Sequence, residues 1–311
     1  MGPEALAQVL SPLVDRFDPS AHPDLLVGLG KADDAAVLRV NARTAVVVTC
    51  DFFAPVVDDP YDYGAIAAAN AMSDVYAMGG EVALALHIAA FPEDLPAETI
   101  QLILKGSADS VAEAGGVVAG GHTVWDSEPK FGLSVLGLAR PSRLMTKSAL
   151  RPGDVLFLSK PLGTGTILTA EKAGEGRAEW TEDAIAWMRR LNRHAMHLAA
   201  EAGCRAATDV TGFGLVGHLW EMAERSGLGI EIEADSLPLL AGARECAAAG
   251  FRTGGEGRNR DWVGDHLALG PAAAPEVEPL LFDPQTSGGL VTGIPARRAA
   301  AFAERAKEDG L

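Results

Sequence analysis

The stretch Tyr61–Phe91, YDYGAIAAANAMSDVYAMGGEVALALHIAAF, decides the fold. Its first part, Tyr61–Met78, is rich in small residues and predicts a helix that packs closely, and the pair Gly79-Gly80 ends it. The apolar run Val82–Phe91 follows at once and predicts a strand. The stretch therefore predicts a helix joined by a short turn to a strand of the core.

Similar elements flank this pair on both sides. Strands are predicted at Ala35–Val40, Thr44–Cys50, Phe131–Ala139 and, short and buried, at Val117–Gly120, and helices at Pro3–Phe17 and Pro96–Ala114. The order predicts one sheet with helices on one face. The longer strands are apolar on both faces, and one layer of helices can cover only one of these faces. We therefore expect the second face to be buried in a symmetric dimer.

A linker divides the sequence near residue 150. Residues 140–153 carry two prolines, and the second belongs to the turn pair Pro152-Gly153. We therefore predict three parts of the chain: an N-terminal helix at 1–20, a first domain at 21–150 and a second domain at 151–311. In the second domain we expect strands at Asp154–Ser159, Leu228–Glu233 and Gly289–Ile294, loops at Asp209 and 253–260, and helices from Thr164 and at Thr181–Ala202, Phe213–Arg225, Pro238–Ala249 and Ala296–Lys307. The fold class is therefore α+β, each domain a sheet with helices packed on one face.

Composition excludes several classes of protein. The 311 residues are 48% hydrophobic, which suits two compact domains, and no apolar run or N-terminal signal pattern predicts a membrane segment or secretion. A net charge of −16 makes nucleic acid a poor partner. Three widely spaced cysteines fit neither a disulfide framework nor a zinc site, so we expect reduced thiols and a cytoplasmic location.

Aspartates with apolar neighbours stand out as candidate metal ligands. They lie in the segments Lys31–Val37, Thr49–Phe53, Asn70–Asp74 and Thr208–Gly214. Singly, Asp34, Asp51, Asp74 and Asp209 are more often turn formers or helix caps. Two carboxylates about 4 Å apart repel by about 4 kcal/mol at an effective dielectric constant of 20, so a cluster needs cations. With oxygen ligands alone, the sequence favours a hard ion such as Mg²⁺.

Two glycine-rich segments are candidate phosphate sites. Gly120–Thr123 follows a predicted strand and could offer backbone N–H groups to an anion, although a lone His122 is more often a turn residue. Gly212–Gly217 matches the dinucleotide fingerprint, with Asp235 about 20 residues further on, and supports an oxidoreductase. The preceding segment is short and polar, and Asp209 would repel a pyrophosphate, so this alternative comes last.

The order of several motifs resembles the selenophosphate synthetase (selenide, water dikinase) family, within the superfamily of aminoimidazole ribonucleotide synthetase. The motifs are Asp33–Val37, Asp51–Pro60, Asn70–Gly80, Gly120–His122, Lys160–Gly163, Thr208–Gly214 and Asp283–Gly289. The resemblance implies the two-domain fold of that superfamily and a homodimer. It also implies a reaction in which ATP, water and selenide give selenophosphate, AMP and phosphate, with Mg²⁺ as the cofactor.

The resemblance also assigns site residues. Asp34, Asp74 and Asp209 match the family's magnesium ligands. The ATP-contacting residues would be Lys31, Ala32, Asp33, Asp51, Asp74, Gly121, His122 and Thr123. No catalytic residue can be assigned, because the family's Cys- or selenocysteine-Gly-x-Lys loop lies before the segment that begins here at Gly2.

That loop and a final strand beyond Leu311 are the departures from the family pattern. We expect either a truncated sequence or a start downstream of an in-frame selenocysteine codon, and a chain that binds Mg·ATP without making selenophosphate on its own. The alternatives are a non-catalytic nucleotide-binding regulatory paralogue and a related kinase, such as a thiamine-phosphate kinase.

Overall fold

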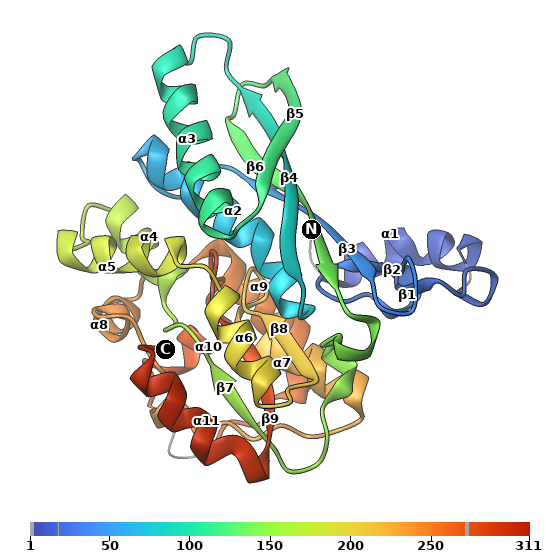
Figure 1. Cartoon of the computed structure of the whole chain (residues 1–311). Coiled ribbons are helices and arrows are strands. Elements are labelled where there is room, and N and C mark those ends of the chain that lie inside the picture. Colours follow the sequence, from blue (N-terminus) through green and yellow to red (C-terminus); the bar gives the residue numbers. More distant parts are fainter. Residues whose placement is uncertain (1–2, 18, 271–273) are drawn as a thin grey trace.

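A computed structural model describes residues 3–17, 19–270 and 274–311 of the chain. Its strands form two sheets, one of six strands in the order β1-β2-β3-β6-β4-β5 and one of three in the order β7-β9-β8. Figure 1 shows the helices α2 and α3 beside the larger sheet and the second half of the chain packed below them. The α+β class is as predicted, whereas the boundary near residue 150 stays a prediction.

The first half contains most of the predicted elements. Its helices are α1 (Pro3–Arg16), α2 (Pro60–Ala77) and α3 (Ala97–Glu113), and its strands are β1 (Leu25–Val27), β2 (Ala36–Arg39), β3 (Ala45–Phe53), β4 (Glu81–Phe91), β5 (Val117–Trp125) and β6 (Lys130–Ala139). The structure differs from the sequence analysis in three places. The sequence did not predict the short β1, β3 continues past Cys50 to Phe53, and β5 is a long exposed strand because it forms the sheet edge.

The helix α2 is the centre of the molecule. It is capped by Asp59, whose side chain accepts the Asp62 backbone N–H at 2.8 Å, and every residue from Tyr63 to Ala77 is buried. Glycines bring α3 unusually close to it. A Cβ atom at Gly64 would lie 1.9 Å from the Ile103 carbonyl oxygen, so only glycine allows this packing.

The opposite face of the larger sheet is open. Large apolar side chains alternate with buried ones along its strands and lie exposed there, as Val48 and Phe52 on β3 and Leu86 on β4 do at 42%, 53% and 40%. The helix α2 packs against β3, β4 and β6 on the other face of the sheet (Figure 1). An apolar sheet face of this kind is typical of an interface.

The second half is built on a small antiparallel sheet. Its strands are β7 (Asp154–Leu158), β8 (Ala206–Asp209) and β9 (Leu290–Pro295), and its helices are α4 (Thr164–Lys172), α5 (Ala178–Arg189), α6 (Arg193–Glu201), α7 (Gly214–Ser226), α8 (Ala243–Ala248), α9 (Gly254–Val263), α10 (Glu278–Phe282) and α11 (Ala296–Glu308). The helices α6 and α11 lie on one face and α7 on the other. We predicted helices on one face of the sheet in each half. The larger sheet has this arrangement, whereas the smaller sheet has helices on both faces.

Several local predictions in this half were wrong. The helix expected at Thr181–Ala202 is interrupted at Arg190–Asn192, and the helix expected at Pro238–Ala249 shortens to α8. The Gly- and Arg-rich segment 253–260 forms α9 instead of a loop. Leu228–Glu233 forms no strand, since its backbone pairs with neither sheet. Tertiary packing overrides local propensity in each case.

The oxidoreductase alternative was also wrong. Asp209 lies on a fully buried strand, β8, which runs antiparallel to β9, whereas a dinucleotide-binding unit needs parallel strands. Gly214 has φ +69° and its missing Cβ would meet the Phe282 backbone, so the glycine serves helix packing. None of the helices in the described residues has the length and apolar character that a membrane crossing requires.

The close approach of α2 and α3 gives a stability prediction. A Cβ at Gly106 would lie 2.0 Å from the Tyr61 carbonyl oxygen, so Gly106→Ala should destabilise the fold by about 1–3 kcal/mol through overpacking. Gly257→Ala on α9 is the matched control, because its Cβ meets nothing and should stabilise by about 0.5–1 kcal/mol. Urea unfolding measures both; equal effects would contradict the packing argument.

Candidate metal and nucleotide site

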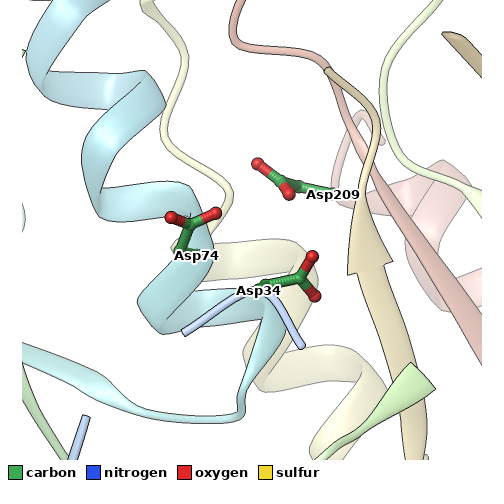
Figure 2. A group of neighbouring side chains, drawn as sticks. All are labelled: Asp34, Asp74 and Asp209. Carbon is green, nitrogen blue, oxygen red and sulfur yellow. The ribbon is translucent and has the colours of Figure 1, made fainter. Parts of the chain in front are cut away.

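Three aspartates from distant parts of the chain converge at the junction of the two halves. Asp34 precedes β2, Asp74 lies on α2 and Asp209 ends β8. One oxygen from each carboxylate lies within 4.8 Å of the others, and Figure 2 shows the three side chains around a common space. The structure thus brings together the three residues that the family resemblance assigns as magnesium ligands.

Burial leaves these carboxylates short of partners. Asp74 is 8% exposed and Asp209 2%. Thr49 Oγ1 donates a hydrogen bond to Asp74 Oδ2, and Thr208 Oγ1 donates one to Asp34 Oδ1 at 2.9 Å. Asp34 Oδ2 and Asp209 Oδ2 are buried without any hydrogen-bond partner. Such oxygens are costly unless a ligand satisfies them.

The electrostatics of the cluster fit a cation. Burial, followed by the charges of Asp209, Asp51 and Asp34, raises the pKa of Asp74 well above its ordinary value. Burial and the charge of Asp34 raise the pKa of Asp209 to about 7. A divalent ion would remove this repulsion and satisfy the unpartnered oxygens, and an all-oxygen donor set suits Mg²⁺.

A lysine that the sequence analysis missed reaches into the cluster. Lys147 begins the 3₁₀ helix η4 (Lys147–Ala149), and its Nζ lies 2.9 Å from Asp34 Oδ1 and 3.0 Å from Glu221 Oε2 on α7. Its side chain is 7% exposed. It holds one oxygen of Asp34 and leaves Oδ2 free. No spacing signal marks Lys147, because it and Glu221 meet only after the halves pack together.

Asp33 has a different environment from that expected. Its two oxygens accept the backbone N–H groups of Asp34 and Lys147, each at 3.0 Å, so it ties the Asp34 loop to the linker. Burial and the charge of Asp34 raise its pKa to about 7. Lys31 ends the 3₁₀ helix η2 (Leu29–Lys31), and its side chain lies outside the described residues.

A hollow of about 520 Å³ lies beside the cluster. Ala32, Asp33 and Asp34 line one part of it, and Val27 and Thr49 line another. Its size is typical of sites for small molecules. The hollow is largely apolar away from the aspartates, which suits a ligand with a flat apolar part and a charged part.

Asp51 lies on the helix-covered side of β3 and contacts α2. Asn70 Nδ2 donates to Asp51 Oδ2 at 2.9 Å. Because Asn70 and Asp74 lie one turn apart on α2, the same helix face holds Asp51 and carries Asp74. Burial raises the pKa of Asp51, and the charge of Asp34 adds to the shift. Asp51 therefore belongs to the same electrostatic group as the three clustered aspartates.

The segment Gly121-His122-Thr123 does not meet the cluster within one chain. It lies on β5 and is exposed. Strand pairing aligns Asp51 with Leu133, His87 and Gly121 in one row across the sheet. Three strand spacings separate the ends of this row by roughly 14 Å. Within one chain, this row places Gly121 well away from Asp51.

The fold and the acidic cluster agree with the protein-family models that match this chain. The family model for the N-terminal domain of AIR synthase related proteins matches residues 32–139, and the model for their C-terminal domain matches residues 151–311. The chain is therefore an AIR synthase related protein, and the superfamily resemblance seen in the sequence is confirmed.

Curated relatives define the family more narrowly. The chain is 48% identical over 299 residues to the selenide, water dikinase of Caldanaerobacter subterraneus subsp. tengcongensis, covering 96% of this chain and 85% of the relative. It is 44% identical to that of Agathobacter rectalis, covering 100% and 90%. The chain belongs to the selenide, water dikinase family, whose members are phosphotransferases.

Solved structures support the fold. The protein tt0281 from Thermus thermophilus has a TM-score of 0.75 at 23% identity, covering 100% of this chain and 91% of that one. AaThiL, complexed with AMPPCP and TMP, has a TM-score of 0.70 at 20% identity, covering 96% and 86%. At these identities the likeness concerns the fold alone.

The raised pKa values give a prediction of stability against pH. Asp33 and Asp209 have folded-state pKa values of about 7, above their ordinary 3.8, so between these values the folded chain binds more protons than the unfolded one. In EDTA we expect the melting temperature to fall as the pH rises from about 5 to about 7. Saturating Mg²⁺ should abolish this fall in scanning calorimetry; a flat or rising melting temperature in EDTA would contradict it.

Proposed function

We propose that this chain binds Mg·ATP at the acidic cluster and serves the synthesis of selenophosphate from selenide, with AMP and phosphate as the other products. The observation that carries the proposal is the set of three converging, buried carboxylates with two unpartnered oxygens, in a chain of the selenide, water dikinase family. An acidic pocket can hold a nucleotide polyanion only through bridging cations.

The residues have separate roles in this proposal. Asp34, Asp74 and Asp209 would hold Mg²⁺, which neutralises charge on the phosphates during phosphoryl transfer. Asp33, Asp51 and the hollow beside them would place the nucleotide. The protein's own part is to fix the geometry of these carboxylates through Thr49, Thr208 and Lys147.

We also propose a homodimer through the open sheet face. The exposed apolar side chains of β3 and β4 supply its centre, and the register places His122 of β5 on the same face as Leu86. Because Gly121-His122-Thr123 lies too far from the cluster of its own chain, we propose that these residues line the nucleotide site of the partner subunit.

Selenide is the proposed acceptor in preference to the phosphate ester of a related kinase. AaThiL binds AMPPCP and TMP, but this chain shares only 20% identity with it and 42–48% with the selenide, water dikinases. A regulatory paralogue without catalysis has no observation in its favour. The cytoplasmic location remains a proposal; Cys50, Cys204 and Cys246 are free, as a reducing compartment requires.

Nucleotide binding tests the assignment of the cluster. Asp74→Asn should weaken the binding of Mg·AMPPNP by about tenfold or more, because it removes a charged ligand shared by metal and nucleotide. EDTA should abolish binding in the unmodified chain. Asp261→Asn, on the exposed side of α9, is the control and should bind normally. Calorimetry that finds equal affinity with and without EDTA would refute the metal-bridged site.

The acceptor is tested by phosphorus NMR with ATP, Mg²⁺ and selenide. The selenide, water dikinase of Caldanaerobacter subterraneus subsp. tengcongensis serves as the positive control in the same assay. Selenophosphate should form, and Asp74→Asn should prevent it. Phosphorylation of thiamine phosphate in place of selenide would favour the alternative kinase.

Light scattering tests the dimer. The unmodified chain should have twice the mass of one chain, and Leu86→Glu should give a monomer because it puts a charge into the open face. Leu102→Glu is the matched control, since Leu102 is equally exposed at 43% but lies on α3. A monomeric unmodified chain at micromolar concentration, or dissociation by both variants, would be evidence against this interface.

A further inference from the structure

The loop Asp283–Gly289 crosses from the second half of the chain to α2. The Ser287 backbone N–H donates to Asn70 Oδ1 at 3.0 Å, and Asn70 also donates to Asp51. The Gly288 carbonyl accepts Asn192 Nδ2 at 2.8 Å, and the same nitrogen donates to Ser73 Oγ, beside Asp74. Ser287 is thus one contact away from the surroundings of Asp51 and Asp74.

The same loop borders Asp209. The Val210 backbone N–H donates to the Gly289 carbonyl at 2.9 Å, and a Cβ at Gly288 would lie 2.1 Å from the Val210 carbonyl oxygen. The loop therefore forms the wall of the acidic cluster on the side of the second half. The roles proposed above for the aspartates assign no function to the residues of this loop.

Ser287 has an unusual conformation for a buried serine. Among the described residues it is the one non-glycine residue with a left-handed backbone, at φ +48°. It is 1% exposed, and its Oγ has no hydrogen-bond partner. A left-handed serine and an unpaired buried hydroxyl both cost free energy, and glycine would avoid both costs. The hydroxyl therefore needs a partner that comes from outside the chain.

Lys160 supplies a second unsatisfied group at the same place. Its side chain is buried, with the residue 3% exposed, and Nζ donates to the Ser287 carbonyl at 2.7 Å. Within the described residues no carboxylate lies at ion-pair distance, so two of the three ammonium donors are unused. Burial lowers its pKa to about 7, against the opposing charge of Asp209. A buried cation without a counter-ion is suited to an incoming anion.

We propose that Ser287 Oγ and Lys160 Nζ form a phosphate-oxygen subsite on the wall of the acidic cluster. The proposal rests on the proposed function, because the anion is either a phosphate of the bound nucleotide or the phosphate that the reaction releases. Mg²⁺ held by the aspartates would neutralise charge on the bound phosphate, and Ser287 Oγ and Lys160 Nζ would donate to phosphate oxygens from the side of the loop. The strained loop holds the pair in place before the anion arrives, so no reorganisation is needed on binding.

The test compares variants that separate the hydroxyl from the backbone strain. Ser287→Ala removes Oγ and keeps the left-handed strain, whereas Ser287→Gly removes both. Each should weaken the binding of Mg·AMPPNP or of inorganic phosphate with Mg²⁺ and AMP by about tenfold, without lowering the melting temperature of the ligand-free chain. Lys160→Met should weaken it further, and Lys172→Met, at the exposed end of α4, is the control.

The two ligands distinguish the sources of the anion. Loss confined to Mg·AMPPNP assigns the subsite to a nucleotide phosphate, and loss confined to inorganic phosphate assigns it to the released product. Unchanged affinity for both ligands in both Ser287 variants would overturn the proposal, whatever the stability of Lys160→Met. If the unmodified chain bound phosphate but not Mg·AMPPNP, the proposed function would fail while the subsite was still tested by its phosphate arm.

Discussion

The carboxylates of Asp34, Asp74 and Asp209 repel one another in a space that water hardly reaches, and the surrounding structure depends on how that repulsion is offset. Threonine hydroxyls and Lys147 hold one oxygen each of Asp74 and Asp34. Asp34 Oδ2 and Asp209 Oδ2 remain without a hydrogen-bond partner. A protein that keeps such a cluster buried gives up stability in the ligand-free state for a site that is already shaped when the cation arrives.

The helix α2 makes this arrangement possible. It carries Asp74 in its buried last turns and Asn70 one turn earlier, and its small residues let the larger sheet, α3 and the second half of the chain all approach it. A helix with bulkier side chains would fill the same volume but would separate β8 from β3. The small residues of α2, which are evident in the sequence, therefore set the distances between the aspartates.

The sequence was informative where a local pattern determines the structure. The small residues of α2 and its glycine stop predicted the core, and the family resemblance assigned Asp34, Asp74 and Asp209 as metal ligands. Lys147 and Ser287 could not be predicted from pattern, because their roles depend on partners more than 70 residues away. The exposed β5 and the unpaired Leu228–Glu233 were missed for a related reason, since sheet edges follow from the whole topology.

The cluster takes its ligands from both halves of the chain, and this ties cation affinity to the relative placement of the halves. Asp34 and Asp74 belong to one half and Asp209 to the other, so the complete ligand set exists only while the halves are packed as in this structure. The apparent affinity is the intrinsic affinity multiplied by the fraction of molecules in that arrangement. Changes far from the aspartates, in the linker or along the contact of α2 with α5 and α6, can thus tune nucleotide binding without touching a ligand.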